Sequence, residues 1–124
     1  MRLLLDTQVM LWWLLDDPRL KPGTRLLIAG NSCLVSVASI WEVAIKHRLG
    51  KLPVAPASFR DHCLQSGATL LPVLDSHAIE TSALPRIHDD PFDRLLIAQA
   101  RLEGLMAVSA DGHWPSYDVT LHRA

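Results

Sequence analysis

The sequence predicts an α/β fold in which helices cover both faces of a mainly parallel β-sheet. Short apolar runs, typical of strands buried on both faces, alternate along the chain with segments of helical character. This alternation favours a three-layer α/β/α sandwich. The chain has 124 residues, of which 49% are hydrophobic, and no linker-like stretch interrupts it. We therefore expect one compact domain over residues 1–124.

The first half of the chain is expected to form, in order, a strand, two helices, a second strand and two further helices, at residues 3–5, 7–15, 24–29, 33–37, 39–49 and 57–65. Pro18 ends the first helix, because proline disfavours helical geometry in the residue before it. Gly50 stands where the C-terminal cap of the 39–49 helix belongs.

The second half is expected to form a strand, two helices and two strands, at residues 69–74, 75–84, 91–103, 106–109 and 119–121. Pro72 predicts an edge or bulged position for the 69–74 strand, because proline has no N–H for a ladder hydrogen bond. Asp90 fits the N-cap of the 91–103 helix, with Pro91 in its first turn and Gly104 just after its end.

The composition narrows the classes of function. The formal net charge is −1, whereas proteins that bind nucleic acid through their overall charge are usually basic. A nucleic-acid function must therefore depend on a local site. The N-terminal apolar run is interrupted at Asp6, so we expect neither a signal peptide nor a membrane span. Cys33 and Cys63 lack the spacing of a metal motif, which favours buried free thiols and a cytoplasmic protein.

Four acidic residues stand where the predicted fold could bring them together. Asp6 directly follows the first strand, and Asp111 follows the 106–109 strand. Glu42 and Asp93 are expected in the first turns of the 39–49 and 91–103 helices. Ligands of open parallel sheets bind beyond the carboxyl ends of the strands, so these carboxylates are expected to converge on one rim.

Such a cluster has a chemical use. Two carboxylates 5 Å apart repel each other by about 3 kcal/mol at an effective dielectric constant of 20. A divalent cation removes that cost, and all-oxygen ligands favour Mg²⁺ or Mn²⁺ over zinc. One or two such ions can activate water and neutralise charge on a phosphodiester during its cleavage.

Each acid also has a purely structural interpretation. Glu42 stands three residues after Ser39, as in a capping box, and Asp93 could act in the same way at its own helix start. Asp6 could cap the helix that follows it, and Asp111 could form a turn. Spacing alone leaves both interpretations open.

The same segments resemble the PIN-domain nucleases, in particular the VapC toxins of bacterial toxin–antitoxin pairs. The resemblance rests on four motifs that occur in the family's order: LLLDT at residues 3–7, SVASIWEVAIK at 36–46, HDDPFDRLLIAQA at 88–100 and VSAD at 108–111. The second and third are long and specific. In the fourth, Ser109 and Ala110 replace the threonine and the basic residue that often precede the aspartate.

The resemblance implies a PIN fold and an Mg²⁺- or Mn²⁺-dependent endoribonuclease. It implies that Asp6, Glu42, Asp93 and Asp111 hold the metal and are catalytic. It also implies a cognate antitoxin that blocks the site, and a homodimer.

Further residues are candidates for contact with the RNA substrate. Thr7 and Ser109 match small hydroxyl positions beside the family's acids, where they would orient a carboxylate or a water. The basic residues near the proposed rim in sequence could bind phosphates; they are Lys46, Arg48, Lys51 and Arg94. A solvated helix face explains these basic residues equally well. His88 is either a general acid or base or an ordinary loop residue.

Two other functions remain open at this point. One is a signalling module similar to a phosphoacceptor receiver domain, which also uses Mg²⁺ and acids at strand ends. The other is a catalytically silent protein-binding module whose acids only cap helices. A phosphatase with a D-x-D motif fits less well, because Gln8 occupies the second acidic position.

Overall fold

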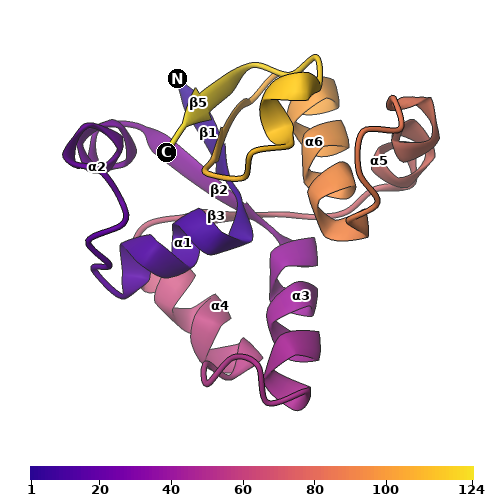
Figure 1. Cartoon of the computed structure of the whole chain (residues 1–124). Helices are drawn as coiled ribbons and strands as arrows, with labels where there is room; N and C mark the ends of the chain where they lie inside the picture. The colour runs from indigo at the N-terminus through magenta and orange to yellow at the C-terminus, as the bar shows by residue number, and fades with distance from the viewer.

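The computed structural model describes residues 1–124 and contains one five-stranded sheet with helices on both sides (Figure 1). The strands are β1 (Arg2–Leu5), β2 (Ser32–Ser36), β3 (Thr69–Leu71), β4 (Met106–Ser109) and β5 (Leu121–Arg123). Their order across the sheet is β3-β2-β1-β4-β5, and all four pairings are parallel. The predicted parallel α/β architecture is therefore confirmed.

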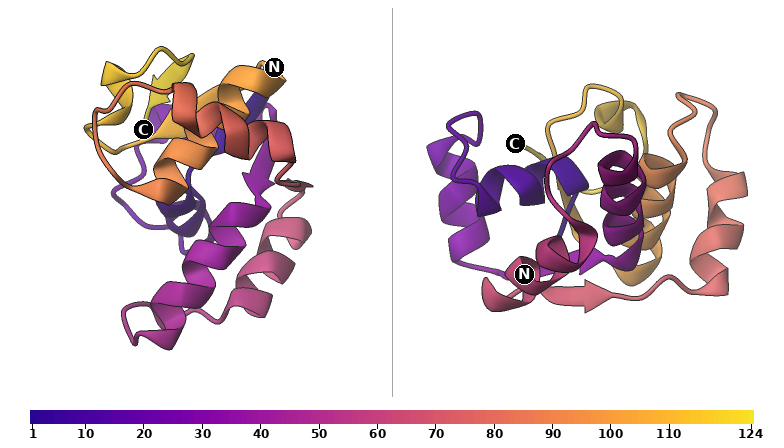
Figure 2. Two further views of the ribbon diagram at one scale, coloured as in Figure 1. Left: turned by 90° about the vertical axis from the view of Figure 1, so that its right-hand side faces the viewer. Right: turned by 90° about the horizontal axis from the view of Figure 1, so that it is seen from below.

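The helices form the two outer layers. They are α1 (Thr7–Leu14), α2 (Pro22–Ala29), α3 (Val37–Arg48), α4 (Pro56–Gln65), α5 (Asp75–Glu80) and α6 (Pro91–Glu103), with the 3₁₀ turns η1 (Thr81–Ala83) and η2 (Trp114–Ser116). Figure 2 shows α1 and α2 on one side of the sheet and α5 and α6 on the other. None of these helices has the length and apolar character that a membrane crossing requires.

The alternation of side chains along β1 divides the hydrophobic core in two. Leu3 and Leu5 point to the face covered by α1, α2 and α4, where they pack with Phe59. Leu4 points to the other face and packs with Leu96 of α6 and with Trp114. All of these side chains are at most 1% exposed, as expected for a parallel sheet covered on both sides.

The order of the strands creates a crevice at the carboxyl edge of the sheet. The chain runs from β1 outward to β2 and β3, and then returns to β4 on the opposite side of β1. The Asp6 N–H donates to Val108 O at 3.0 Å, which extends the β1–β4 ladder by one residue. Such a reversal of strand order leaves room for a ligand between the loops that follow the two strands.

Several element boundaries differ from the prediction. Helix α3 begins at Val37 rather than residue 39, because the Ser36 hydroxyl caps it by accepting from the Ala38 N–H at 3.0 Å. Glu42 therefore lies in the second turn, and the predicted capping box with Ser39 is wrong. Strand β3 ends before Pro72, at the edge of the sheet as predicted, and β5 lies two residues later than expected.

Helix α6 matches its predicted bounds. The Asp90 carboxylate accepts from the Phe92 and Asp93 N–H groups at 2.9 and 3.0 Å, and Pro91 occupies the first turn. Gly104 ends the helix at φ 64°, a left-handed conformation that glycine adopts without a steric penalty. The two cysteines are free, with Cys63 buried and Cys33 half-buried.

Candidate active site

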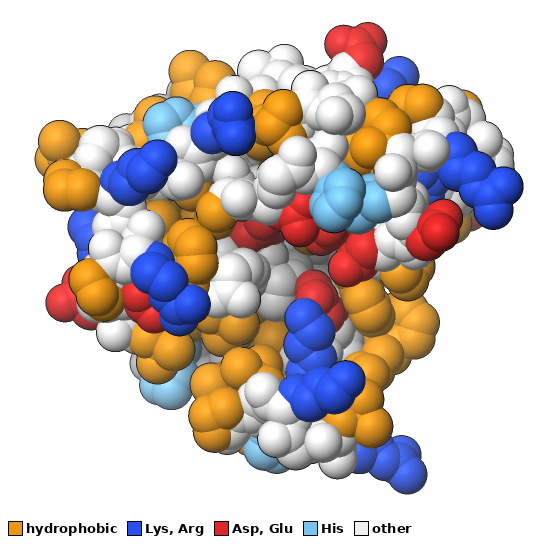
Figure 3. Space-filling view, in the orientation of Figure 1, with side chains coloured by type: hydrophobic (Ala, Val, Ile, Leu, Met, Phe, Trp, Pro, Cys, Tyr) orange, Lys and Arg blue, Asp and Glu red, His pale blue; other side chains and the backbone are white.

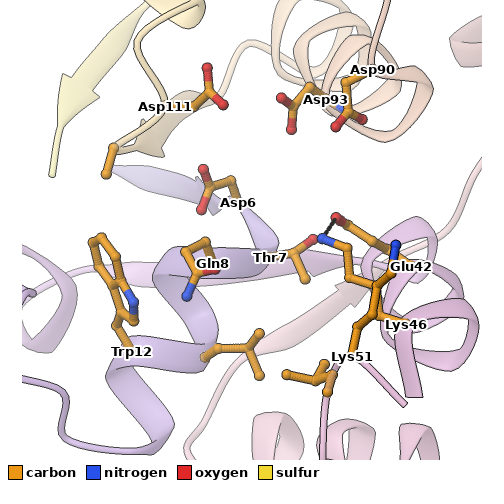
Figure 4. Close-up of a pocket in the computed structure, with 13 residues that line it drawn as sticks. Asp6, Thr7, Gln8, Trp12, Glu42, Lys46, Lys51, Asp90, Asp93 and Asp111 are labelled. Carbon is orange, nitrogen blue, oxygen red and sulfur yellow. Dashed lines mark hydrogen bonds and ion pairs between the residues drawn. The ribbon is translucent and has the colours of Figure 1, made fainter. Parts of the chain in front are cut away.

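The four predicted acids line one cavity of about 560 Å³ at the carboxyl edge of the sheet. Asp6, Glu42, Asp93 and Asp111 come from the ends of β1 and β4 and from α3 and α6. In the space-filling view, acidic side chains gather in a central hollow that is bordered by lysine or arginine side chains (Figure 3). Figure 4 shows Asp6 in the middle, with Asp93 and Asp111 on one side and Glu42 on another.

Asp6 is the most buried of the four, at 5% exposure. Its Oδ1 accepts from the Val9 N–H at 2.7 Å and caps α1, while its Oδ2 accepts from the Ser109 hydroxyl. Burial, together with the charges of Asp93 and Glu42, raises the pKa of Asp6 to about 7 despite the opposite effect of these two hydrogen bonds. The capping interpretation is therefore correct but incomplete, since a cap alone needs no burial among other acids.

Asp93 is free of helix capping because Asp90 performs it. The Asp93 Oδ2 instead lies 3.0 Å from the His88 Nε2. Burial raises the pKa of Asp93, and the neighbouring charges of Asp90 and Asp111 add to the rise. The mutual effects on pKa indicate that these carboxylates repel one another at short range.

Glu42 is buried on the inner face of α3 and pairs with Lys46 one turn later, at 2.7 Å between Oε2 and Nζ. The hydrogen bond to Glu42 raises the pKa of Lys46, and the charges of Asp90 and Asp93 act in the same direction. The Lys46 ammonium thus neutralises part of the negative charge of the cavity (Figure 4).

Asp111 is the most exposed of the four acids. Its Oδ1 accepts from the His113 N–H at 2.8 Å and lies 2.9 Å from the His113 Nδ1. Burial acts to raise the pKa of Asp111, but the hydrogen bonds from His113 outweigh it, so the pKa lies below its ordinary value. The predicted turn at this residue is present, and its carboxylate still faces the cavity.

The predicted substrate contacts divide into two groups. Thr7 and Lys46 line the cavity, and the Thr7 hydroxyl donates to the Ser39 hydroxyl at 2.9 Å. Ser109 is buried behind Asp6, and its hydroxyl also accepts from the Asp111 N–H at 3.1 Å. The Arg94 guanidinium donates to backbone carbonyls of the loop before α6, including Pro85 O at 2.8 Å, so it is occupied away from the cavity.

Sequence patterns did not assign two further residues of α1 to the site. Gln8 and Trp12 line the cavity, as does Lys51 after α3, which the sequence indicated as a candidate phosphate contact (Figure 4). Gln8 and Trp12 are four residues apart and therefore share one helix face, which spacing from Asp6 could have indicated. Tyr117, whose hydroxyl lies 2.6 Å from the His88 Nδ1, gave no signal because it is distant in sequence.

His88, Asp111 and His113 also come close enough together to be considered as metal ligands, with one ligand atom from each within 4.8 Å of the others. The two imidazole rings, however, are stacked at 4.6 Å with planes 15° apart. Ring-nitrogen lone pairs lie in the ring plane, so two parallel rings cannot direct them at one ion. We therefore assign no metal to this group.

The fold is shared with proteins of known structure. A VapBC2 complex from Rickettsia felis bound to a promoter DNA fragment matches with a TM-score of 0.74 at 15% identity, over 99% of this chain and 98% of that chain. DNA-bound VapBC from Salmonella typhimurium matches with a TM-score of 0.70 at 16% identity, over 99% and 98%. A toxin–antitoxin complex from Klebsiella pneumoniae matches with a TM-score of 0.58 at 17% identity, over 87% and 85%.

No curated protein sequence matches this chain. The sequence profile of the PIN domain, by contrast, matches residues 3–119, which include the four predicted acids of the cavity. With nearly the whole chain covered by that profile, and the parallel sheet and its crevice in place, the chain belongs to the PIN domain family.

Proposed function

We propose that this chain, as a single PIN domain over residues 1–124, is an Mg²⁺- or Mn²⁺-dependent endoribonuclease and the toxin of a toxin–antitoxin pair in the cytoplasm. The observation that carries the proposal is the convergence of Asp6, Glu42, Asp93 and Asp111 on one cavity at the strand-order reversal. Helix capping explains Asp90, but it gives no reason for Glu42 or Asp93 to face the same space.

The donor set fits a hard divalent cation. It consists of carboxylate oxygens, and burial together with neighbouring charge raises the pKa of Asp6 to about 7. A cation held by Asp6 and Asp93, with Glu42 and Asp111 completing the site, would offset the repulsion between these carboxylates. Such an ion supplies activated water for attack on phosphorus and neutralises charge on the phosphodiester. Ser109 and Val9 hold the two oxygens of Asp6 in place.

The remaining walls of the cavity suit a single RNA strand. Lys46 and Lys51 lie beside the acids, where their ammonium groups can bind phosphates on either side of the scissile bond. Gln8 and Trp12 form the opposite wall, and aromatic side chains commonly stack on unpaired bases. Thr7 lies between the two walls and would orient a water or a carboxylate. We assign Arg94 to the support of the loop rather than to RNA.

The proposal is tested by RNA cleavage with Asp6→Asn and Asp93→Asn. Both substitutions keep the size of the side chain and remove a ligand charge, so cleavage in Mg²⁺ should fall by at least about 100-fold, within the range that electrostatic groups supply to catalysis. Asp118→Asn is the matched control, because this exposed aspartate lines a different cavity. Cleavage that persists in the folded variants, or in the presence of a chelator, rejects the proposal.

The antitoxin follows from the resemblance and from the neighbours, two of which are VapBC complexes and one of which is described as a toxin–antitoxin complex. Expression of the chain alone should arrest growth and leave discrete cuts in cellular RNA. Co-expression of a small protein encoded next to it should prevent both effects. Equal growth with and without that neighbour argues against a toxin.

A homodimer is supported by an apolar ridge along α3. Val37, Trp41, Ile45 and Leu49 recur every four residues and are 41, 62, 37 and 62% exposed. A contiguous apolar stripe of this kind usually marks a contact surface. Light scattering should therefore show a dimer that Trp41→Glu dissociates and that Leu26→Glu, on α2, leaves intact.

A further inference from the structure

His88 is held between the candidate metal ligand Asp93 and a buried tyrosine. Its Nε2 lies 3.0 Å from the Asp93 Oδ2, and its Nδ1 lies 2.6 Å from the Tyr117 hydroxyl. The Tyr117 hydroxyl in turn lies 3.2 Å from the Arg94 Nη1. The His88 side chain is only 10% exposed, and Tyr117 is 4% exposed. Four residues from three parts of the chain therefore form one continuous run of hydrogen bonds.

The two ends of this run fix the direction of every bond in it. The Arg94 guanidinium can only donate, and an ionised Asp93 carboxylate can only accept. A neutral His88 therefore carries its proton on Nε2, from which it donates to Asp93. Its Nδ1 is then an acceptor, to which Tyr117 donates its own proton while the Tyr117 oxygen accepts from Arg94.

We propose that Arg94, Tyr117 and His88 form a directed chain of hydrogen-bond donors that positions Asp93 for cation binding. The proposal rests on the proposed function, since it assigns these residues to the support of the same metal site. Partners that hydrogen-bond to ligating groups orient them, and loss of one typically costs 10- to 100-fold in metal affinity or activity. The chain engages Oδ2 of Asp93 and leaves Oδ1 for the ion.

The chain is anchored firmly at its far end. The Arg94 guanidinium donates to Pro85 O at 2.8 Å and to Thr81 O at 2.9 Å, in addition to the Tyr117 hydroxyl. Because Arg94 directly follows Asp93 in α6, these bonds fix the loop that carries His88 to the start of this helix. This role accounts for an arginine beside the metal site whose nitrogens point away from the cavity.

The same arrangement extends to a second acid. The His113 ring stacks on His88 at 4.6 Å, and its Nδ1 lies 2.9 Å from the Asp111 Oδ1. Displacement of His88 therefore removes the stacking partner that holds His113 beside Asp111. His88 does not line the cavity, so we assign it as a positioning residue and not as a general acid or base.

The first arm of the test measures the tautomer of His88 without any metal. Long-range ¹H–¹⁵N spectra at alkaline pH distinguish protonated Nδ1 from protonated Nε2, and the His88→Gln spectrum identifies the His88 signals. We expect the Nε2–H tautomer in the unsubstituted protein and also in Tyr117→Phe, in which the Asp93 carboxylate still accepts from Nε2. An Nδ1–H tautomer in the unsubstituted protein overturns the proposal whatever the protein's activity.

The second arm measures Mn²⁺ affinity by calorimetry, together with the melting temperature. Tyr117→Phe removes only a hydroxyl and should weaken Mn²⁺ binding about 10-fold with little change in melting temperature. His88→Leu should weaken it at least as much, whereas His88→Gln, which keeps a donor toward Asp93, should restore part of the affinity. His122→Gln is the matched control, since that imidazole contacts Thr24 outside the cavity.

The possible outcomes separate this proposal from the proposed function. Wild-type Mn²⁺ affinity in Tyr117→Phe and His88→Leu, with cleavage still lost in Asp93→Asn, overturns only the donor chain. Absence of Mn²⁺ binding by the unsubstituted protein overturns both proposals. If His88→Gln binds Mn²⁺ no more tightly than His88→Leu, the donor role is contradicted. The weakened binding is then due to a loss of packing.

Discussion

At the residue scale, the interactions of Asp6 have opposite effects on the stability of the folded protein. Its carboxylate caps α1 and accepts from the Ser109 hydroxyl, yet it is buried near two other acids that disfavour its charge. Burial raises the pKa of Asp6 from 3.8 to about 7. A raised pKa means that the folded protein binds this proton more tightly than the unfolded chain. The contribution to stability is therefore greatest at low pH and is lost as the pH rises to about 7.

We predict that Asp6→Asn stabilises the metal-free protein while it abolishes cleavage. The asparagine amide can accept from Val9 and donate to Ser109, so both hydrogen bonds survive without a buried charge. The gain in melting temperature over the unsubstituted protein should be larger at about pH 8 than at about pH 5. Calorimetry with a chelator present measures both gains, and equal gains at the two pH values contradict the burial of an ionisable Asp6.

The Lys46 Nζ forms an ion pair with the Glu42 Oε2 at 2.7 Å in the metal-free protein. A bound cation and the ammonium group must therefore compete for this carboxylate. We predict that Lys46→Met tightens Mn²⁺ binding and weakens RNA binding. The dependence of log K on log salt should decrease by about 0.7, the value for one phosphate contact on a single strand. Arg48→Met, which removes an equal charge outside the cavity, should change neither. Unaltered RNA affinity in Lys46→Met removes this residue from the substrate contacts.

At the scale of elements, the start of α6 separates a cap from a ligand. Asp90 lines the cavity, but its Oδ1 accepts from two N–H groups of the first turn. We predict that Asp90→Asn, which keeps an efficient cap, leaves stability and cleavage nearly unchanged. Asp90→Ala should lower the free energy of unfolding by about 1 kcal/mol. Chemical denaturation and the cleavage assay check both effects, and a large loss of cleavage in the stable Asp90→Asn variant makes Asp90 a fifth ligand.

The cavity face of α1 has a testable role in RNA binding. The Arg19 guanidinium lies 5.1 Å over the Trp12 ring, and the Trp12 indole N–H has no hydrogen-bond partner. Trp12→Phe therefore leaves no polar group without its partner. We predict that Trp12→Ala weakens the binding of single-stranded RNA by about 1–3 kcal/mol, the usual contribution of one stacked base, and that Trp12→Phe retains most of the affinity.

Fluorescence anisotropy with labelled RNA in the presence of a chelator measures this affinity without cleavage. Trp13→Ala, on the same helix but lining a different cavity, is the matched control for Trp12→Ala. An equal effect of the Trp12 and Trp13 substitutions assigns the loss to the packing of α1 and not to stacking.

The element boundaries show which features can be predicted from residues that are close in sequence. Asp90, Pro91 and Gly104 fixed both ends of α6 correctly, because cap chemistry acts within a few residues. The start of α3 was predicted wrongly, because Ser36 and Ser39 are both good caps. Only the tertiary structure decides between them, since the Thr7 hydroxyl donates to Ser39 inside the helix. Strand β3 stops at Leu71 because Pro72 cannot continue the ladder.

At the scale of the whole molecule, the four acids could be predicted but their supports could not. Asp6 and Asp111 follow apolar runs, and the carboxyl ends of parallel strands share one edge, so their convergence followed from topology. The order β3-β2-β1-β4-β5, which places β4 beside β1, is not encoded in any local pattern. The contacts of Tyr117 with His88 and Arg94 depend on that order, which explains why sequence spacing did not indicate them.

The central claim is that these acids together hold a divalent cation, and anomalous diffraction from crystals soaked in Mn²⁺ tests it most directly. We predict an anomalous peak in the cavity within about 2.2 Å of carboxylate oxygens of Asp6 and Asp93, close to the distance of about 2.0–2.1 Å at which Mg²⁺ binds oxygen ligands. The peak should disappear in Asp93→Asn. A cavity without a peak at saturating Mn²⁺, with the acids directed away from one another, would contradict the account.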